Sequence, residues 1–534
     1  MAVFLLTILS GALALTLYRI CQIGRRLPGY PPGPPTLPLI GNLHQIPSKA
    51  PHIQFQKWAR EYGPVYSLIL GTKVMIVLTS DKAVRDLLDK RNNIYSSRPE
   101  MYLGQFLSGG NRMVLMEYGD TWRMIRKMLH STLNINAARS YVPYQDLENK
   151  QMLCELIDEP DLFVDHIRRF ANSLTTQIVF GFRTISINDP KFIQLFTGFV
   201  KTSELLGSEV AALLDIFPIL RALPDFMLPM RRYAKRLRKD ENKLYVGHWM
   251  TAKNGLKHGT AKPCICGNMV KVQDDEGFSD ELAAYTSGSL LEAGSDTTSS
   301  TLVGFIQAMI LFPDAQRKAR EEIDRVCGDR LPTLEDEPHL QYIRGCVKES
   351  LRWMPTAILG VPHAVLMDDE YMGYKIPKGA TIIYNAWYVR GIHMDSTRYP
   401  NPSTFDPARY ANDFQSASEA AANPDVSKRD HFGFGAGRRI CQGMHIAERS
   451  LFLGISRMLW GFEFDNARDA QGNEIVPDAE KLTDGIVVLP QRFPAKITPR
   501  SEKHSQIIRE EWDKCLPLLD PSMQWKDLSG VVAK

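Results

Sequence analysis

A glycine-rich loop near the end of the chain places one cysteine where it could bind a metal. The loop is His431-Phe432-Gly433-Phe434-Gly435-Ala436-Gly437-Arg438-Arg439-Ile440-Cys441-Gln442-Gly443. Because glycine takes positive φ and lets the backbone approach a flat cofactor closely, Gly435, Gly437 and Gly443 favour a tight cradle. An apolar helical pattern follows Cys441, and a helix N-terminus stabilises a thiolate. The loop therefore predicts a thiolate ligand, with Arg439 able to pair with a carboxylate of the cofactor.

A second polar group lies inside a long helical pattern over residues 278–311. Its sequence, Ala293-Gly294-Ser295-Asp296-Thr297-Thr298, has low helix propensity, so another interaction must compensate. Thr297 can donate a hydrogen bond to the carbonyl of Ala293 and open the helix locally, which would leave room for a small ligand such as dioxygen or water. Taken alone, such a pattern is more often a helix cap or a kink.

Together these two segments resemble the cytochrome P-450 family. Phe434-x-x-Gly437-x-Arg439-x-Cys441-x-Gly443 matches the family's haem-binding signature at each fixed position. The Asp296–Thr297 pair precedes Cys441 by about 145 residues (441 − 296), as in the family. The resemblance implies a haem b cofactor with Cys441 as axial iron ligand, since a thiolate favours O–O cleavage. It also implies that Asp296 relays protons and that Thr297 assists the activation of dioxygen.

Two further groups of residues match family positions around the haem. Glu349 and Arg352, at i and i+3, resemble with Arg409 the family's structural triad, a buried bidentate network without a catalytic role. Trp122 and Arg126, at i and i+4, and His363 match positions that bind the haem propionates. The cofactor-binding residues that the resemblance assigns are Trp122, Arg126, His363, Phe434, Gly437, Arg439, Cys441 and Gly443.

The elements that must position these residues are mostly helical. Apolar residues recur at three- and four-residue spacing over residues 80–91, 147–157, 278–311 and 315–326. Residues 65–70 and 74–78 predict a β-hairpin, residues 380–383 and 486–489 are further candidate strands, and residues 251–278 predict a surface loop. No repeat or interdomain linker is evident, so we expect an α+β fold, mainly α with small β-sheets. One large domain of the P-450 type would span residues 50–500, with a C-terminal extension over residues 501–534.

The N-terminal segment predicts a membrane anchor. Residues 1–18 carry no charged side chain and are long enough to cross a hydrocarbon core of roughly 30 Å. A cleaved secretory signal is the alternative, but no basic region precedes the apolar run. Arg19, Arg25 and Arg26 follow it and favour a cytosolic position for the rest of the chain. We therefore expect a single-pass transmembrane helix in the endoplasmic reticulum membrane, then a basic, proline-rich linker over residues 19–49.

Composition limits the partners. A formal charge of +4 over 534 residues does not indicate nucleic-acid binding. The 8 cysteines are scattered, which favours reduced thiols; Cys264-Ile-Cys266 is the only close pair and lacks the second half of a zinc site.

No flavin or nicotinamide fingerprint is present, so the resemblance implies electrons from a separate partner, NADPH-cytochrome P-450 reductase. A basic docking face could comprise Arg123, Lys127, Arg438 and Arg449.

The expected reaction is insertion of one oxygen atom from O2 into a small hydrophobic organic substrate. Candidate pocket segments are residues 101–106 and 205–219, Leu290, Ala293, residues 358–359 and Ile486, which are mostly apolar. The overall chain, including its C-terminal extension, resembles filamentous-fungal members of the family that work in secondary metabolism. This resemblance favours hydroxylation of an aromatic polyketide or a related metabolite. The alternatives are a haem-thiolate isomerase or dehydratase that does not use O2, another substrate class (alkaloid, terpenoid or xenobiotic), and a membrane scaffold without haem. The intact Asp296–Thr297 pair argues against the first of these.

Overall fold

The computed structural model of this protein describes residues 2–47, 49–386, 398–429 and 432–526. Some residues of the predicted segments lie outside the described residues: Met1 of the anchor, Ser48 of the linker, His431 of the cysteine loop and residues 527–534 of the extension.

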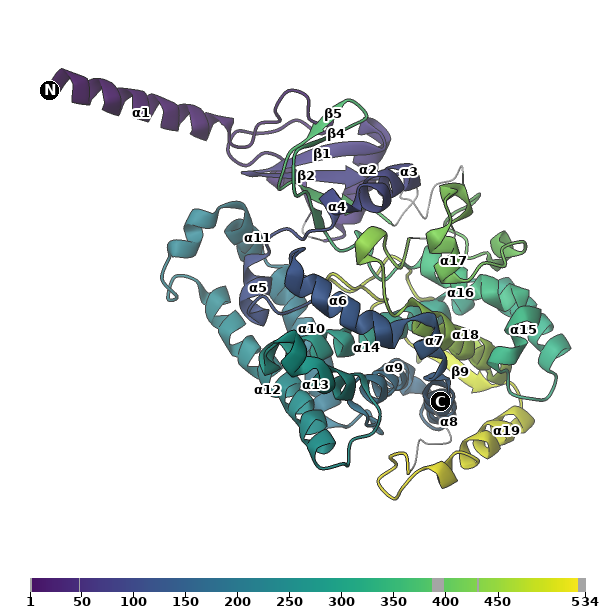
Figure 1. Cartoon of the computed structure of the whole chain (residues 1–534). Helices are drawn as coiled ribbons and strands as arrows, with labels where there is room; N and C mark the ends of the chain where they lie inside the picture. The colour runs from purple at the N-terminus through teal and green to yellow at the C-terminus, as the bar shows by residue number, and fades with distance from the viewer. Residues whose placement is uncertain (1, 48, 387–397, 430–431, 527–534) are drawn as a thin grey trace.

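Helices form most of the described chain and surround a long helix, α14, in the lower part of the molecule (Figure 1). The helices are α1 (Ala2–Gln22), α2 (Pro51–Tyr62), α3 (Asp81–Val84), α4 (Asn92–Tyr95), α5 (Tyr102–Ser108), α6 (Asp120–Leu133), α7 (Ile135–Arg139), α8 (Val142–Asp158), α9 (Phe163–Phe180), α10 (Pro190–Leu206), α11 (Glu209–Ile216), α12 (Pro229–Lys257), α13 (Ile265–Glu276), α14 (Asp280–Leu311), α15 (Pro313–Cys327), α16 (Gln341–Trp353), α17 (Ala417–Ala422), α18 (Met444–Gly461) and α19 (Glu502–Asp513).

The strands are short and form three small sheets among the described residues. They are β1 (Val65–Leu70), β2 (Lys73–Leu78), β3 (His363–Ala364), β4 (Asp369–Tyr371), β5 (Tyr374–Ile376), β6 (Thr381–Tyr384), β7 (Phe462–Arg468), β8 (Glu474–Ile475) and β9 (Ala495–Pro499). The largest sheet has the order β1-β2-β6-β3, with β1 and β2 antiparallel and β2 and β6 parallel. The prediction of a mainly α fold with small sheets is confirmed, including the hairpin and the strand near residue 380.

Helix α14 is buried along most of its length. Its buried residues are mostly small or apolar and lie around the helix, so other elements can pack against it from several directions. Its second half carries Leu302, Phe305, Ile306 and Met309, each of them fully buried. It packs against α9, α12, α16 and α18, so the Asp296–Thr297 segment is held from several sides at once.

Two local predictions are wrong. Residues 486–489 form no strand; an isolated bridge between Leu482 and Pro490 closes this segment instead. Residues 251–278 are not a loop, since α12 continues to Lys257 and α13 follows. Only one face of α13 is apolar. The many polar residues on its other faces make the helical spacing of its apolar residues hard to recognise in the sequence. Cys264 caps this helix, its sulfur accepting a hydrogen bond from the Gly267 N–H at 3.4 Å.

Helix α1 projects away from the body (Figure 1) and exposes large apolar side chains, among them Phe4, Leu5 and Leu9. Thr7 and Ser10 interrupt its apolar sequence, and Arg19 lies in its last turn. Among the helices in the described part of the chain, none is sufficiently long and apolar to cross a membrane. The prediction of an N-terminal transmembrane helix is therefore not supported.

The proline-rich segment after α1 is attached to the sheet along its length. The guanidinium of Arg26 donates to the carbonyls of Gly33 and Pro34, at 2.9 and 3.0 Å, and to the hydroxyl of Ser67 in β1 at 3.0 Å. The Gly24 N–H donates to the Gly71 carbonyl at 3.0 Å. These contacts fix the segment against β1 and the β1–β2 turn.

The chain beyond residue 500 also packs onto the body. Trp525 inserts its buried ring 5.8 Å from that of Tyr144 in α8, and its indole N–H donates to the side chain of Gln177 in α9 at 2.6 Å. Arg183 donates to the Met523 carbonyl at 2.8 Å. The C-terminal segment therefore covers one end of α8 and α9.

Candidate active site

The cysteine loop is built around a close approach between two backbones. Gly437 has a φ of +63°, and a Cβ at this position would lie 1.9 Å from the carbonyl oxygen of Leu88. Leu88 and Asp89 belong to a π-helical turn, η2 (Arg85–Lys90), and the Asp89 carboxylate accepts a hydrogen bond from the Gly437 N–H at 2.6 Å. Only glycine fits here, on grounds of both space and backbone conformation.

Cys441 lies two residues before Gly443, the N-cap of α18. Its N–H donates to the Phe434 carbonyl at 2.9 Å, which closes the loop. The thiol is accessible, yet burial by the surrounding protein raises its pKa. A hydrogen bond from the Gly443 backbone and the charge of Arg126 act in the opposite direction and favour the thiolate.

Four basic side chains gather beside this loop: Arg98, Arg126, His363 and Arg439. Burial and repulsion from Arg98 and Arg126 lower the pKa of Arg439 to about 9, and burial lowers those of Arg98 and Arg126 to about 10. Burial, with the charges of Arg98 and Arg439, lowers the pKa of His363 to about 3, so this imidazole is neutral near pH 7. The site thus concentrates positive charge on side chains that are buried, as Arg98 and His363 are, or partly buried, as Arg126 and Arg439 are.

These arginines are held by backbone carbonyls. Arg439 donates to the carbonyls of Ser96 and Met116, both at 2.8 Å. Arg98 donates to the carbonyls of Val114, at 2.9 Å, and of Val361 and Pro362, both at 2.7 Å. Among the described residues, no carboxylate forms an ion pair with Arg98, Arg126 or Arg439, although buried cations are costly without an anion.

Trp122 and His363 complete this cluster from two other elements. Trp122, in α6, is buried, and its ring centroid lies 4.1 Å from the guanidinium of Arg439 and 5.8 Å from that of Arg126. His363, in β3, has its Nδ1 at 2.7 Å from the Tyr95 carbonyl. The structure thus brings together the predicted residues Trp122, Arg126, His363, Arg439 and Cys441 from elements far apart in sequence.

Arg98 is a member that the sequence analysis missed. It stands in Tyr95-Ser96-Ser97-Arg98-Pro99, a short irregular segment with no periodic pattern. Its burial follows from the position of this segment beside β3, where the Ala364 N–H donates to the Ser97 carbonyl at 2.9 Å. A lone arginine before a proline carries no local signal for such a role.

The predicted hydrogen bond in α14 forms, with the Thr297 hydroxyl donating to the Ala293 carbonyl at 2.6 Å. The helix nevertheless continues without interruption, so the expected local opening is absent. A Cβ on Gly294 would lie 2.4 Å from the Thr175 hydroxyl, which explains the glycine by the close packing of α9. Burial raises the pKa of Asp296 to about 6, while the charge of Arg168 lowers it and that of Glu292 raises it further.

Glu349, Arg352 and Arg409 also meet as the sequence predicts. Both side chains of the Glu349–Arg352 pair are fully buried, and Arg352 donates to each carboxylate oxygen at 2.6 Å. Arg409 reaches the same carboxylate at 3.3 Å, and the Asp406 N–H donates to it at 2.8 Å. This network joins α16 to the segment around residue 406.

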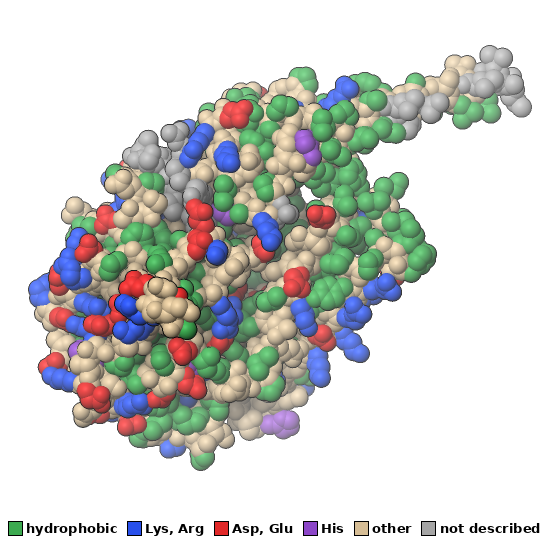
Figure 2. Space-filling model, turned by 180° about the vertical axis from the view of Figure 1, so that it is seen from behind, with side chains coloured by type: hydrophobic (Ala, Val, Ile, Leu, Met, Phe, Trp, Pro, Cys, Tyr) green, Lys and Arg blue, Asp and Glu red, His purple; other side chains and the backbone are tan. Residues whose placement is uncertain are grey.

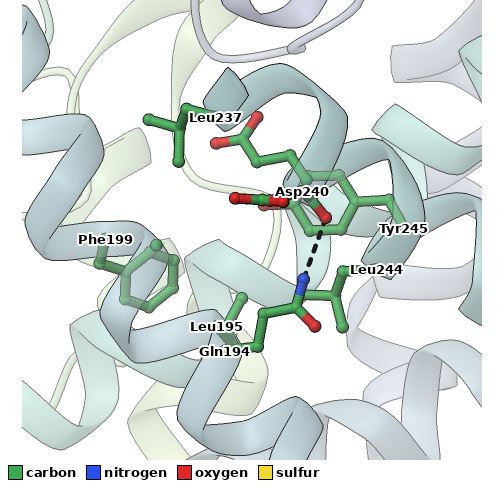
Figure 3. A pocket seen from close by; sticks show the side chains of 9 residues that line it. Gln194, Leu195, Phe199, Leu237, Asp240, Leu244 and Tyr245 are labelled. Carbon is green, nitrogen blue, oxygen red and sulfur yellow. Dashed lines mark hydrogen bonds between the residues drawn. The ribbon is translucent and has the colours of Figure 1, made fainter. Parts of the chain in front are cut away.

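Two hollows are found among the described residues. One is a broad, open hollow beside the cysteine loop; its lining residues are Trp122, Arg123, Arg126, Lys127, His130 and Gln442. The other, shown in Figure 3, is a cavity of about 20 Å³ between α10 and α12, where the Gln194 amide donates to the Asp240 carbonyl at 3.0 Å. It has room for one water and is too small for an organic substrate.

Comparison with known proteins identifies the family. A family model described as Cytochrome P450 matches residues 31–496. The chain belongs to the cytochrome P450 family. It is 55% identical over 518 residues to the cytochrome P450 monooxygenase virE of Hypocrea virens, covering 97% of this chain and 94% of that protein. It is 56% identical over 521 residues to fogE of Aspergillus ruber (97% and 96%) and 51% identical over 528 residues to fsoB of Humicola fuscoatra (98% and 97%), which carry the same description.

The protein is thus a cytochrome P450 monooxygenase, and its cofactor is haem b. The residues present fit this cofactor. Haem b carries two propionates, and the three arginines beside the cysteine loop, of which Arg98 is buried and Arg126 and Arg439 are partly buried, are the groups that two such anions would neutralise. Cys441, an exposed residue two positions before the N-cap of α18, offers the kind of sulfur that a haem-thiolate protein uses as a ligand.

Proposed function

We propose that Cys441 is the axial ligand of the haem iron and that Arg98, Arg126 and Arg439 bind the two propionates. The observation that carries this proposal is the cluster of three arginines beside the cysteine loop, one buried and two partly buried, that form no ion pair with a carboxylate among the described residues. Trp122 supports Arg439 and Arg126 through its ring. Neutral His363 uses its one N–H on the Tyr95 carbonyl, so it would have to take up a second proton to donate to a propionate. Phe434, Gly437 and Gly443 shape the loop around the sulfur, and Glu349, Arg352 and Arg409 have the structural role expected for the triad.

Haem b, when bound, supplies the activation of dioxygen. Asp296 is the proposed proton-relay group, because a carboxyl with a pKa of about 6 both holds and releases a proton near neutral pH. Thr297 is held by its hydrogen bond to Ala293, which fixes the orientation of its hydroxyl on α14. Together they would deliver protons while the buried surroundings limit the entry of bulk water.

The proposed substrate is a hydrophobic aromatic polyketide or a related metabolite of fungal secondary metabolism, which the enzyme hydroxylates. The predicted pocket segments support an apolar substrate, since α5, α10 and α11 pack together through Leu103, Leu107, Leu205 and Leu214. The fungal relatives carry the general description of P450 monooxygenase and support the reaction class.

The decisive experiment has two stages. The ferrous carbon-monoxide difference spectrum should show the red-shifted thiolate band in the wild type and lose it in Cys441→Ala; the same band in both would refute the ligand assignment. Turnover under ¹⁸O₂ should then place one labelled oxygen atom in an aromatic polyketide and none in matched terpenoids or alkaloids. Conversion that proceeds without O2 would favour an isomerase or dehydratase instead.

The proposed electron donor is NADPH-cytochrome P450 reductase, which would dock on the open hollow beside the cysteine loop. Arg123 and Lys127 are exposed there, and Arg438 is exposed next to the loop. Such a basic, concave surface complements an acidic partner. Arg449 is partly buried, which lowers its pKa, so it contributes less to this surface than the sequence indicated.

The proposed location is the endoplasmic reticulum membrane, with the catalytic domain in the cytosol and membrane lipid as a partner. Figure 2 shows hydrophobic side chains gathered below the projecting N-terminal helix. Exposed apolar residues from two segments, among them Leu39, Ile40, Ile219 and Phe226, flank the β1–β2 turn, where the Gly71 N–H donates to the Ile40 carbonyl at 3.2 Å. Flotation with lipid vesicles should require α1 or this surface; a protein lacking residues 2–22 and carrying Ile219→Asp and Phe226→Asp should remain unbound. Full binding by that variant would refute membrane attachment.

A further inference from the structure

The loop between α5 and α6, residues 109–119, holds two of the buried arginines by its backbone. The Val114 carbonyl accepts a hydrogen bond from Arg98, and the Met116 carbonyl accepts one from Arg439. The loop has no helix or strand of its own. The positions of both guanidinium groups therefore depend on what fixes this loop.

Arg112, in the same loop, is bound to two long helices. Its Nη2 donates to both oxygens of Glu241 in α12, at 2.8 and 2.7 Å, and its Nη1 donates to Glu292 in α14 at 2.5 Å. The side chains of Arg112 and Glu241 are 8% and 7% exposed, and that of Glu292 is 14% exposed. An ion pair so far removed from water persists only when its geometry is good.

The carboxylates are themselves held in place. The Tyr245 hydroxyl of α12 donates to Glu292, and the Thr202 hydroxyl donates to Glu241 at 3.2 Å. Burial lowers the pKa of Arg112, but Glu292 and Glu241 outweigh burial and raise it well above its usual value. Arg112 thus remains charged and has a strong preference for this one position.

We propose that Arg112 is a positioning residue for the haem: through Glu241 and Glu292 it fixes the loop whose carbonyls hold Arg98 and Arg439. Helices α12 and α14 would in this way determine the geometry of the propionate-binding arginines. This inference rests on the proposed role of Arg98 and Arg439 toward the propionates, and the experiment separates the two.

The matched variants are Arg112→Lys, Glu241→Gln and Glu292→Gln, with Arg439→Ala as the reference for direct loss of a propionate partner. Lysine keeps the charge but cannot donate to two carboxylates in the fork geometry of arginine. Asp146→Asn is the control, because it removes an ion pair with another buried arginine, Arg457, between α8 and α18. It should lower thermal stability without affecting the loop.

The readouts are the rate of haem transfer to excess apomyoglobin and hydrogen exchange over residues 109–119. We expect at least fivefold faster haem transfer in Arg112→Lys, Glu241→Gln and Glu292→Gln, with faster exchange confined to the loop, and wild-type values for both readouts in Asp146→Asn. Faster transfer in Arg439→Ala but not in the Arg112 or Glu241 variants would overturn the role of Arg112. Unchanged transfer in Arg439→Ala would overturn the proposed propionate role and the inference with it.

Discussion

The guanidinium of Arg439 lies 4.1 Å from the ring centroid of Trp122; the Trp122 side chain is buried, and Arg439 is partly buried. A cation over an indole face is stabilised by about 2 kcal/mol when it is desolvated. This contact therefore offsets part of the cost of burying a guanidinium that has no carboxylate partner among the described residues.

Replacement of Trp122 should weaken haem retention in a graded way. Trp122→Phe keeps an aromatic face but weakens the interaction with Arg439, so haem loss should accelerate a fewfold; Trp122→Ala should accelerate it further. Haem transfer to apomyoglobin, with protein folding followed by circular dichroism, measures this. Equal rates in Trp122→Phe and the wild type would show that the ring serves packing alone.

Gly437→Ala should disrupt the cysteine loop. The new Cβ would meet the Leu88 carbonyl at a backbone conformation unfavourable to alanine, which should lower the free energy of unfolding by more than about 2 kcal/mol. Gly247→Ala is the control, since this glycine lies in α12 with nothing within 4 Å of its Cβ position. Urea denaturation should show a loss for the first variant and no loss for the second.

The buried carboxyl of Asp296 should make stability depend on pH in a defined direction. Its pKa is about 6 in the folded protein and 3.8 in its ordinary state, so the folded protein binds the proton more tightly. Folding is therefore favoured below about pH 4, and this contribution is lost as the pH rises through 6. The difference of 2.2 units (6 − 3.8) corresponds to about 3 kcal/mol.

Asp296→Asn removes this titration. Relative to the wild type, the variant should gain about 2 kcal/mol of stability between pH 4.5 and pH 7.5, as measured by urea denaturation at both values; the rest of the effect falls below pH 4.5. A stability difference independent of pH would contradict the raised pKa.

Glu349→Gln should be strongly destabilising because it leaves Arg352 charged in a fully buried site. Loss of one partner of such a pair costs about 3–5 kcal/mol. Arg409→Lys should cost less, because Arg409 contacts the carboxylate at 3.3 Å and keeps 10% of its side chain exposed. Thermal unfolding of the two variants checks this order, and a larger loss for Arg409→Lys would contradict it.

Charge reversal at Arg123 and Lys127 tests the docking surface. The double variant Arg123→Glu, Lys127→Glu should raise the reductase concentration needed for half-maximal turnover at low salt, and the difference should shrink as ionic strength rises. The control is Lys82→Glu, which reverses a positive charge in the same way at an exposed lysine that pairs with Asp86. Identical salt dependence in all three proteins would place docking elsewhere.

The sequence predicts those site residues that lie close together in the chain or belong to a motif with several fixed positions. The loop around Cys441, the i and i+3 pair Glu349–Arg352 and the β1–β2 hairpin all follow from short-range patterns. Arg98 and Arg112 could not be found in this way, because both carboxylate partners of Arg112 and two of the three carbonyl partners of Arg98 come from segments well over 100 residues away. The helix α13 was missed for a related reason, since its buried face is recognisable only against the elements that cover it.

The anchoring of Trp525 has a consequence for how the chain can be shortened. Its indole N–H donates to the side-chain oxygen of Gln177, and the Met523 carbonyl accepts from Nη1 of Arg183. A protein ending at residue 500 would remove both bonds from these two buried side chains and would uncover Tyr144. Such a truncated protein should aggregate even though the whole stretch matched by the family model remains intact. Residues 523–525 therefore cover the buried ends of α8 and α9. The shortest form of this enzyme that stays in solution should extend at least to residue 526.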